Sequence, residues 1–280
     1  MPGADTVRQK YLSRFAGHTK RNVIAYYSAF LTRPRIDGLE INDMDMNGFM
    51  NVIHGMRKED GLDLVLHTPG GGIAATEAIV QYLRSFFAGN IRCFVPQLAM
   101  SAGTMIACAC NEIFMGRQSS LGPIDPQMGG VACHGVVEEF EKAMRDVEKT
   151  PEKIHVWRPI IERYHPTFIG ECEKAIELSK LLVREWLETG MFHNNPKAKL
   201  LSGKVVQSLN NHSKTKTHDR HISYDQAKKL GLRVVKLEDD GALQDLALSI
   251  HHAYISTFTN TKAVKIIESN MNVSFIMNAN

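Results

Sequence analysis

The chain has 280 residues, of which 44% are hydrophobic and 22% are charged, with a formal net charge of +3 at pH 7. This composition fits an ordinary soluble globular protein with one large domain, or one domain and a small appendage. The net charge is too small to indicate a nucleic-acid partner. No apolar run reaches the ~18 residues of a membrane span, and the basic start of the chain lacks the apolar block of a signal peptide. We therefore expect a chain that is neither exported nor anchored in a membrane.

The cysteines predict a reducing compartment. Their number is odd, none forms a C-x-x-C pair, and several lie within apolar runs. Buried, reduced thiols are therefore expected, and with them a cytoplasmic location. The histidines show no metal-ligand spacing, so no metal site is predicted. The cysteines are Cys93, Cys108, Cys110, Cys133 and Cys172.

The N-terminal part of the chain predicts an outer arm followed by the first elements of a sheet. Residues 1–21 are polar and basic, and are expected to form an arm or helix on the outside of the fold or against another subunit. Residues 22–30 (NVIAYYSAF) are rich in β-forming side chains and predict a strand. In 44–56 the apolar residues recur at helical spacing, which predicts a helix.

Two strand–turn–helix units follow, and in each the strand ends at a corner of small residues. The apolar run 62–67 meets Thr-Pro-Gly-Gly-Gly at 68–72, and the run from 91 leads to Met-Ser-Ala-Gly at 100–103. Strands that alternate with helices predict a parallel sheet, and such corners expose backbone N–H groups at its carboxyl edge. A serine hydroxyl beside a glycine corner supplies a nucleophile and amides that could hold an oxyanion.

After these corners the chain is expected to be mainly helical. Residues 111–115 predict a short strand, and the sequence GRQSSLGPIDPQMGG after it predicts an irregular loop of the kind that positions functional groups. Helices are predicted from 135 to about 187 from their apolar stripes. The polar, basic stretch 191–220 is predicted to be a mobile excursion.

Ser223 and Gly231 are expected to cap a short helix that leads into a last strand. These elements divide the chain into the arm 1–21, a main domain over 22–237, and a C-terminal helix with a frayed tail over 238–280.

Four motifs stand in order along the chain: HTPGGG, AMSAGTMIA, SLGPIDPQ and THDRHISYDQAKKLGL. Together they resemble the serine dehydrogenase proteinase family of the Clp protease and crotonase superfamily, over roughly residues 23–235. The resemblance implies an α/β fold, a spiral of ββα units with a helical C-terminal appendage. It also implies assembly through helical appendages, so a homo-oligomer of the trimer, tetramer or hexamer class is expected. No G-x-G-x-x-G opens a helix after a strand, so no nicotinamide cofactor is predicted.

The resemblance also assigns roles to individual residues. Ser101 matches the nucleophile of the family's peptidases, and the N–H groups of Gly71 and Ala102 match the donors of the oxyanion hole. Gly70 and Gly72 lack a Cβ, so a substrate backbone can approach them closely. Without these roles, Ser101 would be a helix cap and the glycines a tight turn.

The general base is left open among three residues. Asp219 matches the carboxylate of the Clp triad, but the stretch that carries the histidine of that triad contains none here. Lys142 would complete a Ser–Lys dyad like that of related signal-peptide peptidases, provided that burial lowers its pKa. His218, next to Asp219, and His134 are the other candidates.

The predicted function is that of a cytoplasmic serine peptidase that cleaves peptides or unfolded segments through an acyl-enzyme at Ser101. An acyl-CoA or thioester enzyme of the crotonase type is the alternative, because the same two amides would stabilise an enolate. A catalytically inactive assembly scaffold of the same fold is also kept open. The serine at the second corner favours the peptidase, since enolate chemistry does not require it.

Overall fold

The computed structural model describes residues 2–34, 36–210 and 220–279. Its centre is a mixed seven-stranded sheet in the order β11-β10-β1-β2-β3-β5-β9. The five strands from β1 to β9 run parallel, whereas β10 is antiparallel to β1 and β11 to β10. Their bounds are β1 Asn22–Ser28, β2 Leu62–His67, β3 Ile91–Val95, β5 Glu112–Met115, β9 Val234–Lys236, β10 Ala263–Ser269 and β11 Ser274–Asn278.

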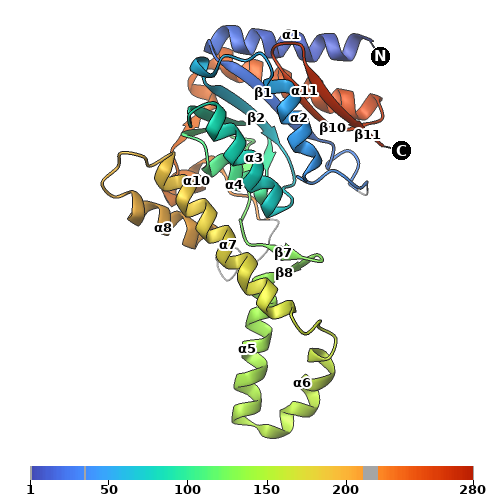
Figure 1. The fold of residues 1–280 in the computed structure, drawn as a ribbon, viewed down its shortest axis with the longest axis vertical. Helices are drawn as coiled ribbons and strands as arrows, with labels where there is room; N and C mark the ends of the chain where they lie inside the picture. Colours follow the sequence, from blue (N-terminus) through green and yellow to red (C-terminus); the bar gives the residue numbers. More distant parts are fainter. Residues whose placement is uncertain (1, 35, 211–219, 280) are drawn as a thin grey trace.

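Helices cover both faces of this sheet (Figure 1), so β1, β2 and β10 are buried along their whole length. The larger core lies under α2 (Met44–Ile53), α3 (Ile73–Phe86), α4 (Ala102–Cys108), α7 (Phe168–Thr189), α8 (Ala198–Leu209) and α10 (Tyr224–Leu230). The core on the opposite face lies under α1 (Pro2–Thr19) and α11 (Gly241–Asn260). The predicted arm 1–21 is thus a helix that packs on α11 of the same chain.

A helical hairpin projects away from the sheet (Figure 1). It consists of α5 (Cys133–Lys149), the short 3-10 helix Pro151–Lys153, and α6 (Ile154–Ile161). The α6 segment has no buried residue, and α5 buries few. Two more 3-10 helices, Lys58–Asp60 and Leu237–Asp239, lie in the connections. Two short pairs complete the described elements: β4 (Leu98–Ala99) with β6 (Ser120–Leu121), and β7 (Gln127–Met128) with β8 (Val131–Ala132).

The prediction of a mobile excursion over 191–220 was wrong for the part that forms α8. There, Leu201, Val205 and Leu209 recur every four residues and form an apolar stripe that packs on the main core. The many lysines and serines around them concealed this stripe in the sequence. Residues 211–219 lie outside the described part of the chain.

The prediction of a frayed tail after the last helix was also wrong. Residues 263–269 form β10, which lies between β1 and β11 inside the sheet. The β-branched residues Val264, Ile266 and Ile267 favour a strand. Lys265 and Glu268 interrupt the apolar pattern, but each is buried in an ion pair, and the strand is therefore stable with charges inside.

The capping prediction for the short helix is confirmed. Ser223 accepts from the N–H of Gln226, and the side chain of Gln226 accepts in return from the N–H of Ser223. Gly231 ends the helix in the left-handed conformation, with φ at 102°. Such a capping box and a left-handed glycine fix both ends of α10. Among the described helices, none is long and apolar enough to cross a membrane.

Candidate active site

The corners after β2 and β4 lie side by side at the carboxyl edge of the sheet. Thr68 donates its N–H to the carbonyl of Leu98 at 3.1 Å, and Met100 donates to the carbonyl of Thr68 at 3.0 Å. This short parallel bridge pairs Thr68, two residues before Gly70, with Ala99, two residues before Ser101. The two corners predicted from the sequence are therefore one structural unit.

Gly70 and Ser101 touch within this unit. A Cβ on Gly70 would lie 2.7 Å from the Cβ of Ser101 and 2.9 Å from the nitrogen of Ala102. Gly70 also has φ at 102°, a conformation that favours glycine. Its lack of a side chain is therefore what allows the serine to approach the glycine corner.

Ser101 stands in a sharp turn between β4 and α4. It has φ at 51° and ψ at −116°, a combination rare for a residue with a side chain. Within the described chain its hydroxyl makes no capping hydrogen bond to α4, and the residue is half-buried. The structure thus argues against a simple helix cap. A serine held in a strained strand-to-helix turn is the geometry of a nucleophile elbow.

The N–H of Ala102 directly follows Ser101, and that of Gly71 follows Gly70, which contacts the serine. Neither N–H donates a hydrogen bond to another backbone group among the described residues. A Cβ on Gly71 would lie 2.3 Å from the backbone nitrogen and oxygen of Ile41, so only glycine fits there. Two unpaired donors beside a hydroxyl have the chemical composition of an oxyanion hole.

The loop with the sequence SLGPID packs beside the serine. A Cβ on Gly122 would lie 3.2 Å from the nitrogen of Ser101, and the N–H of Gly122 donates to the hydroxyl of Thr104 in α4 at 2.9 Å. Further along, Ile124 donates to the carbonyl of Leu209 at 3.0 Å. The irregular loop is thus ordered, and it links the serine corner to the end of α8.

The candidate bases lie in different parts of the molecule. Lys142 is exposed on α5 of the projecting hairpin, with its ammonium 5.9 Å from the ring centre of Trp157. Its helix, α5, projects away from the sheet (Figure 1). His134, at the start of α5, has its Nε2 2.5 Å from the Oδ1 of Asn210. His218 and Asp219 lie outside the described residues.

The structure also shows a buried aromatic cluster beside the glycine corner that the sequence did not indicate. His67, the last residue of β2, has its ring 5.1 Å from that of His251 in α11 and 5.4 Å from that of Tyr27. Burial lowers the pKa of His67 to about 3 and that of His251 to about 4. Both rings are therefore neutral at physiological pH. Among the described residues, no group of three metal-ligating side chains comes together.

A parallel α/β sheet with these two adjoining corners places the chain among the ClpP-like proteins. The chain belongs to the family of ClpP-like SDH-type serine proteinases, whose model matches residues 8–240. This match confirms the family and the fold class predicted from the four motifs.

Two curated relatives come from Methanocaldococcus jannaschii. Uncharacterized protein MJ0137 is 30% identical over 190 residues, which are 68% of this chain and 59% of that protein. Uncharacterized protein MJ1495 is 30% identical over 173 residues, which are 62% of this chain and 51% of that protein. The chain thus spans between half and three fifths of the curated relatives it matches.

Proposed function

We propose that the chain is a serine peptidase that cleaves peptides or unfolded segments through an acyl-enzyme at Ser101. The observation that carries this proposal is the contact between Gly70 and Ser101, because it places a strained serine beside the glycine corner. The serine hydroxyl attacks the substrate carbonyl, and the N–H groups of Gly71 and Ala102 stabilise the resulting oxyanion. Gly70 lets the serine approach the corner, and Gly72 leaves room for the substrate backbone. Removal of one such donor lowers kcat by about 10² to 10³ in other enzymes.

We propose that the proton acceptor comes from the segment that follows Asn210, with His218 as the base and Asp219 as its partner. Both ends of this segment are tied to the SLGPID loop beside Ser101. Leu209 accepts from Ile124, and Ile222 exchanges two hydrogen bonds with Leu121. The described residues on both sides of the segment therefore contact the loop beside Ser101.

The other two candidates are less well supported. His134 contacts Asn210, directly before that segment, and is the second choice. Lys142 faces Trp157 on the hairpin, so in this arrangement it could serve only a serine of another copy.

We further propose that the active protein is a cytoplasmic homo-oligomer of the trimer, tetramer or hexamer class. All five cysteines are free and buried, which suits a reducing compartment. The hairpin carries a cavity of about 490 Å³ with Phe140, Met144 and Trp157 in its wall. Met144 and Val156 are 67% and 63% exposed on it, an apolar surface that another copy could cover.

A fluorophosphonate probe tests the chemistry, because it labels only activated serines. We expect labelling of the wild type, none of Ser101→Ala, and labelling of Lys142→Ala at the wild-type rate. We expect His218→Ala to label at least ~100-fold more slowly, the usual size of a general-base contribution. Loss of labelling in His134→Ala but not in His218→Ala would identify His134 of α5 as the base. A folded wild type that does not label at all would favour the thioester enzyme or the inactive scaffold.

A further inference from the structure

A buried ion pair lies on the α2 side of β10, outside the corners described above. Lys265 Nζ is 2.8 Å from Asp45 Oδ1, and both side chains are 0% exposed. The hydroxyl of Tyr26 in β1 donates to Asp45 Oδ2 at 2.8 Å. Burial lowers the pKa of Lys265, and the neighbouring Asp45 opposes that shift. Removing one partner of such a pair would leave an unpaired buried charge, so the pair holds its neighbours firmly.

The pair holds the backbone on both sides of Ile41. The ammonium of Lys265 donates to the carbonyl of Glu40 at 2.7 Å. On the other side, Asp45 Oδ2 accepts from the N–H of Asn42 at 3.0 Å. The residue between them is therefore fixed by one cation and one anion.

Ile41 in turn holds the backbone on both sides of Gly71. Its N–H donates to the carbonyl of Gly70 at 2.8 Å, and its carbonyl accepts from the N–H of Gly72 at 2.9 Å. In a parallel bridge of this kind the central residue turns its own N–H to the opposite side. Ile41 thus directs the N–H of Gly71 away from itself.

We propose that Lys265 and Asp45 are positioning residues, which hold the Gly71 N–H in its oxyanion-binding orientation through Ile41. The inference rests on the proposed function, in which Gly71 supplies one of the two donors. Oxyanion donors stabilise a transition state only when they are oriented in advance, so a rigid support behind Gly71 has catalytic value. Lys265 lies beyond residues 8–240, the part that matches the family model. The C-terminal strand pair would therefore contribute to the site without touching the substrate.

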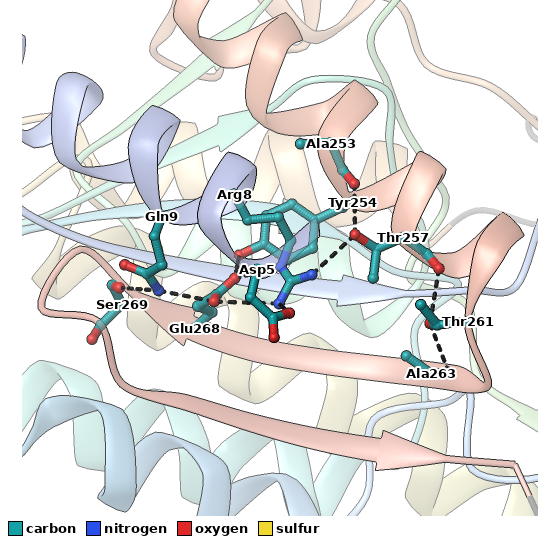
Figure 2. Close-up of polar contacts among 10 residues, drawn as sticks. All are labelled: Asp5, Arg8, Gln9, Ala253, Tyr254, Thr257, Thr261, Ala263, Glu268 and Ser269. Carbon is teal, nitrogen blue, oxygen red and sulfur yellow. Dashed lines mark hydrogen bonds and ion pairs between the residues drawn. The ribbon is translucent and has the colours of Figure 1, made fainter. Parts of the chain in front are cut away.

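The same strand provides a matched control on its other face. Glu268 of β10 pairs with Arg8 of α1 at 2.7 Å, with both side chains nearly fully buried. Tyr254 donates to Glu268 at 2.6 Å, and Arg8 donates to the hydroxyl of Thr257 at 3.0 Å. Figure 2 shows that this network joins α1, α11 and β10. Among the described residues, the hydrogen bonds of this network do not reach the segment around Ile41 or the glycine corner.

The test compares two double variants, each of which removes both charges of one pair. These are Lys265→Met with Asp45→Asn, and Arg8→Met with Glu268→Gln. Removing both charges avoids an unpaired buried ion, so both variants are expected to fold. Hydrogen exchange of the peptide amides at 70–73 is measured first, because it requires no enzymatic activity. Fluorophosphonate labelling is then resolved into kinact, the maximal rate constant of labelling, and KI, the probe concentration at half of that rate.

We expect amide exchange at 70–73 to rise at least tenfold in the Lys265 and Asp45 variant, and kinact to fall about 10- to 100-fold, up to the contribution of one donor. KI should change less than threefold, because the ligand-contacting groups remain. The Arg8 and Glu268 variant should keep the exchange and kinact of the wild type, even if its melting temperature falls.

Equal exchange at 70–73 in both variants would overturn the positioning role. If the Lys265 and Asp45 variant does not fold, Tyr26→Phe replaces it, since it removes one hydrogen bond to Asp45 and leaves both charges. That variant should raise exchange at 70–73 about threefold, in line with one lost hydrogen bond, and unchanged exchange would refute the proposal. A wild type that exchanges slowly at 70–73 but is not labelled by the probe would contradict the proposed peptidase. The comparison of amide exchange between the two double variants would then still test whether Lys265 and Asp45 hold the glycine corner.

Discussion

Charged side chains are buried in pairs in the sheet and its covering helices, but lie in solvent on the α5–α6 hairpin. In the sheet, Asp63 of β2 is 0% exposed and binds both Arg21 and Arg92. On the hairpin, Asp146 and Lys153 form a pair whose side chains are 27% and 47% exposed. The apolar residues show the opposite trend, because Met144 and Val156 of the hairpin face solvent.

This difference separates two tasks within one chain. The sheet body holds a strained serine and close backbone contacts, which need a rigid support. The hairpin contributes little to that support, since its α6 segment has no buried residue. Substitutions at the buried contacts of the body should therefore change stability, and those at the serine and glycine corners should also change the chemistry. Substitutions on the hairpin should change neither.

The largest effect on labelling is expected from Gly71→Ala in the body. The new Cβ would lie 2.3 Å from backbone atoms of Ile41, which cannot move without breaking its bonds to the glycine corner. We expect loss of fluorophosphonate labelling and a fall of about 1–3 kcal/mol in the free energy of unfolding. Urea denaturation and labelling measure the two effects.

At neighbouring Gly72 a Cβ would meet Ile41 only at 3.6 Å, so Gly72→Ala should leave stability within about 1 kcal/mol of the wild type. Equal stability of both variants would show that the corner is not tightly packed.

The largest effect on stability is expected from Asp63→Asn. This change leaves Arg21 and Arg92 without their shared carboxylate, beside a strand that is fully buried. We expect the free energy of unfolding to fall by about 3–5 kcal/mol, the usual result of breaking a buried pair. Asp146→Asn on the hairpin is the matched control and should not change the unfolding curve. A large loss from the hairpin variant would contradict the division between body and hairpin.

The comparison also shows which parts of the fold the sequence could predict. The two corners, the turn at Ser101 and the caps of α10 were predictable, because each depends on residues close together in the chain. The apolar stripe of α8 and the β-branched run of β10 were also present in the sequence. The stripe of α8 was missed because lysines and serines surround it. The strand β10 was missed because Lys265 and Glu268 interrupt its apolar pattern, and their partners come from distant segments.

The support of the glycine corner could not be predicted in this way. Lys265 reaches the carbonyl of Glu40 across 225 positions of sequence, and Ile41 stands in a segment without a motif. Such contacts follow from the tertiary fold rather than from local spacing. Local spacing failed for Lys142 for the same reason. Its spacing from Ser101 suggested a Ser–Lys dyad, but its helix projects from the body.

A smaller effect, again in the body, is expected from pH. His67 and His251 are neutral when folded, with pKa values lowered by burial to about 3 and about 4. The unfolded chain binds protons below pH ~6.5, so both contributions are complete above that pH and decline as pH falls towards the folded values. Between pH 7.5 and 5.5 each histidine should remove about 1.4 kcal/mol from the free energy of unfolding. His67→Phe should abolish one of these losses in urea titrations at the two pH values. Replacement of the exposed His155 on the hairpin is the control, and an unchanged pH dependence in His67→Phe would count against the buried cluster.

The smallest effect on stability is expected from Val156→Asp on the hairpin. This side chain is 63% exposed, so a carboxylate there loses no hydration and the melting temperature should stay within about 1 °C of the wild type, as for most surface changes. The assembly should respond differently, because a charge in the middle of an apolar contact has to be desolvated when two copies meet. Sedimentation velocity should therefore show smaller particles for Val156→Asp at concentrations where the wild type is assembled. Leu200→Asp is the matched control, since Leu200 is 70% exposed on α8, away from the hairpin. If both variants sediment like the wild type, the hairpin does not join the copies, and its apolar surface needs another explanation.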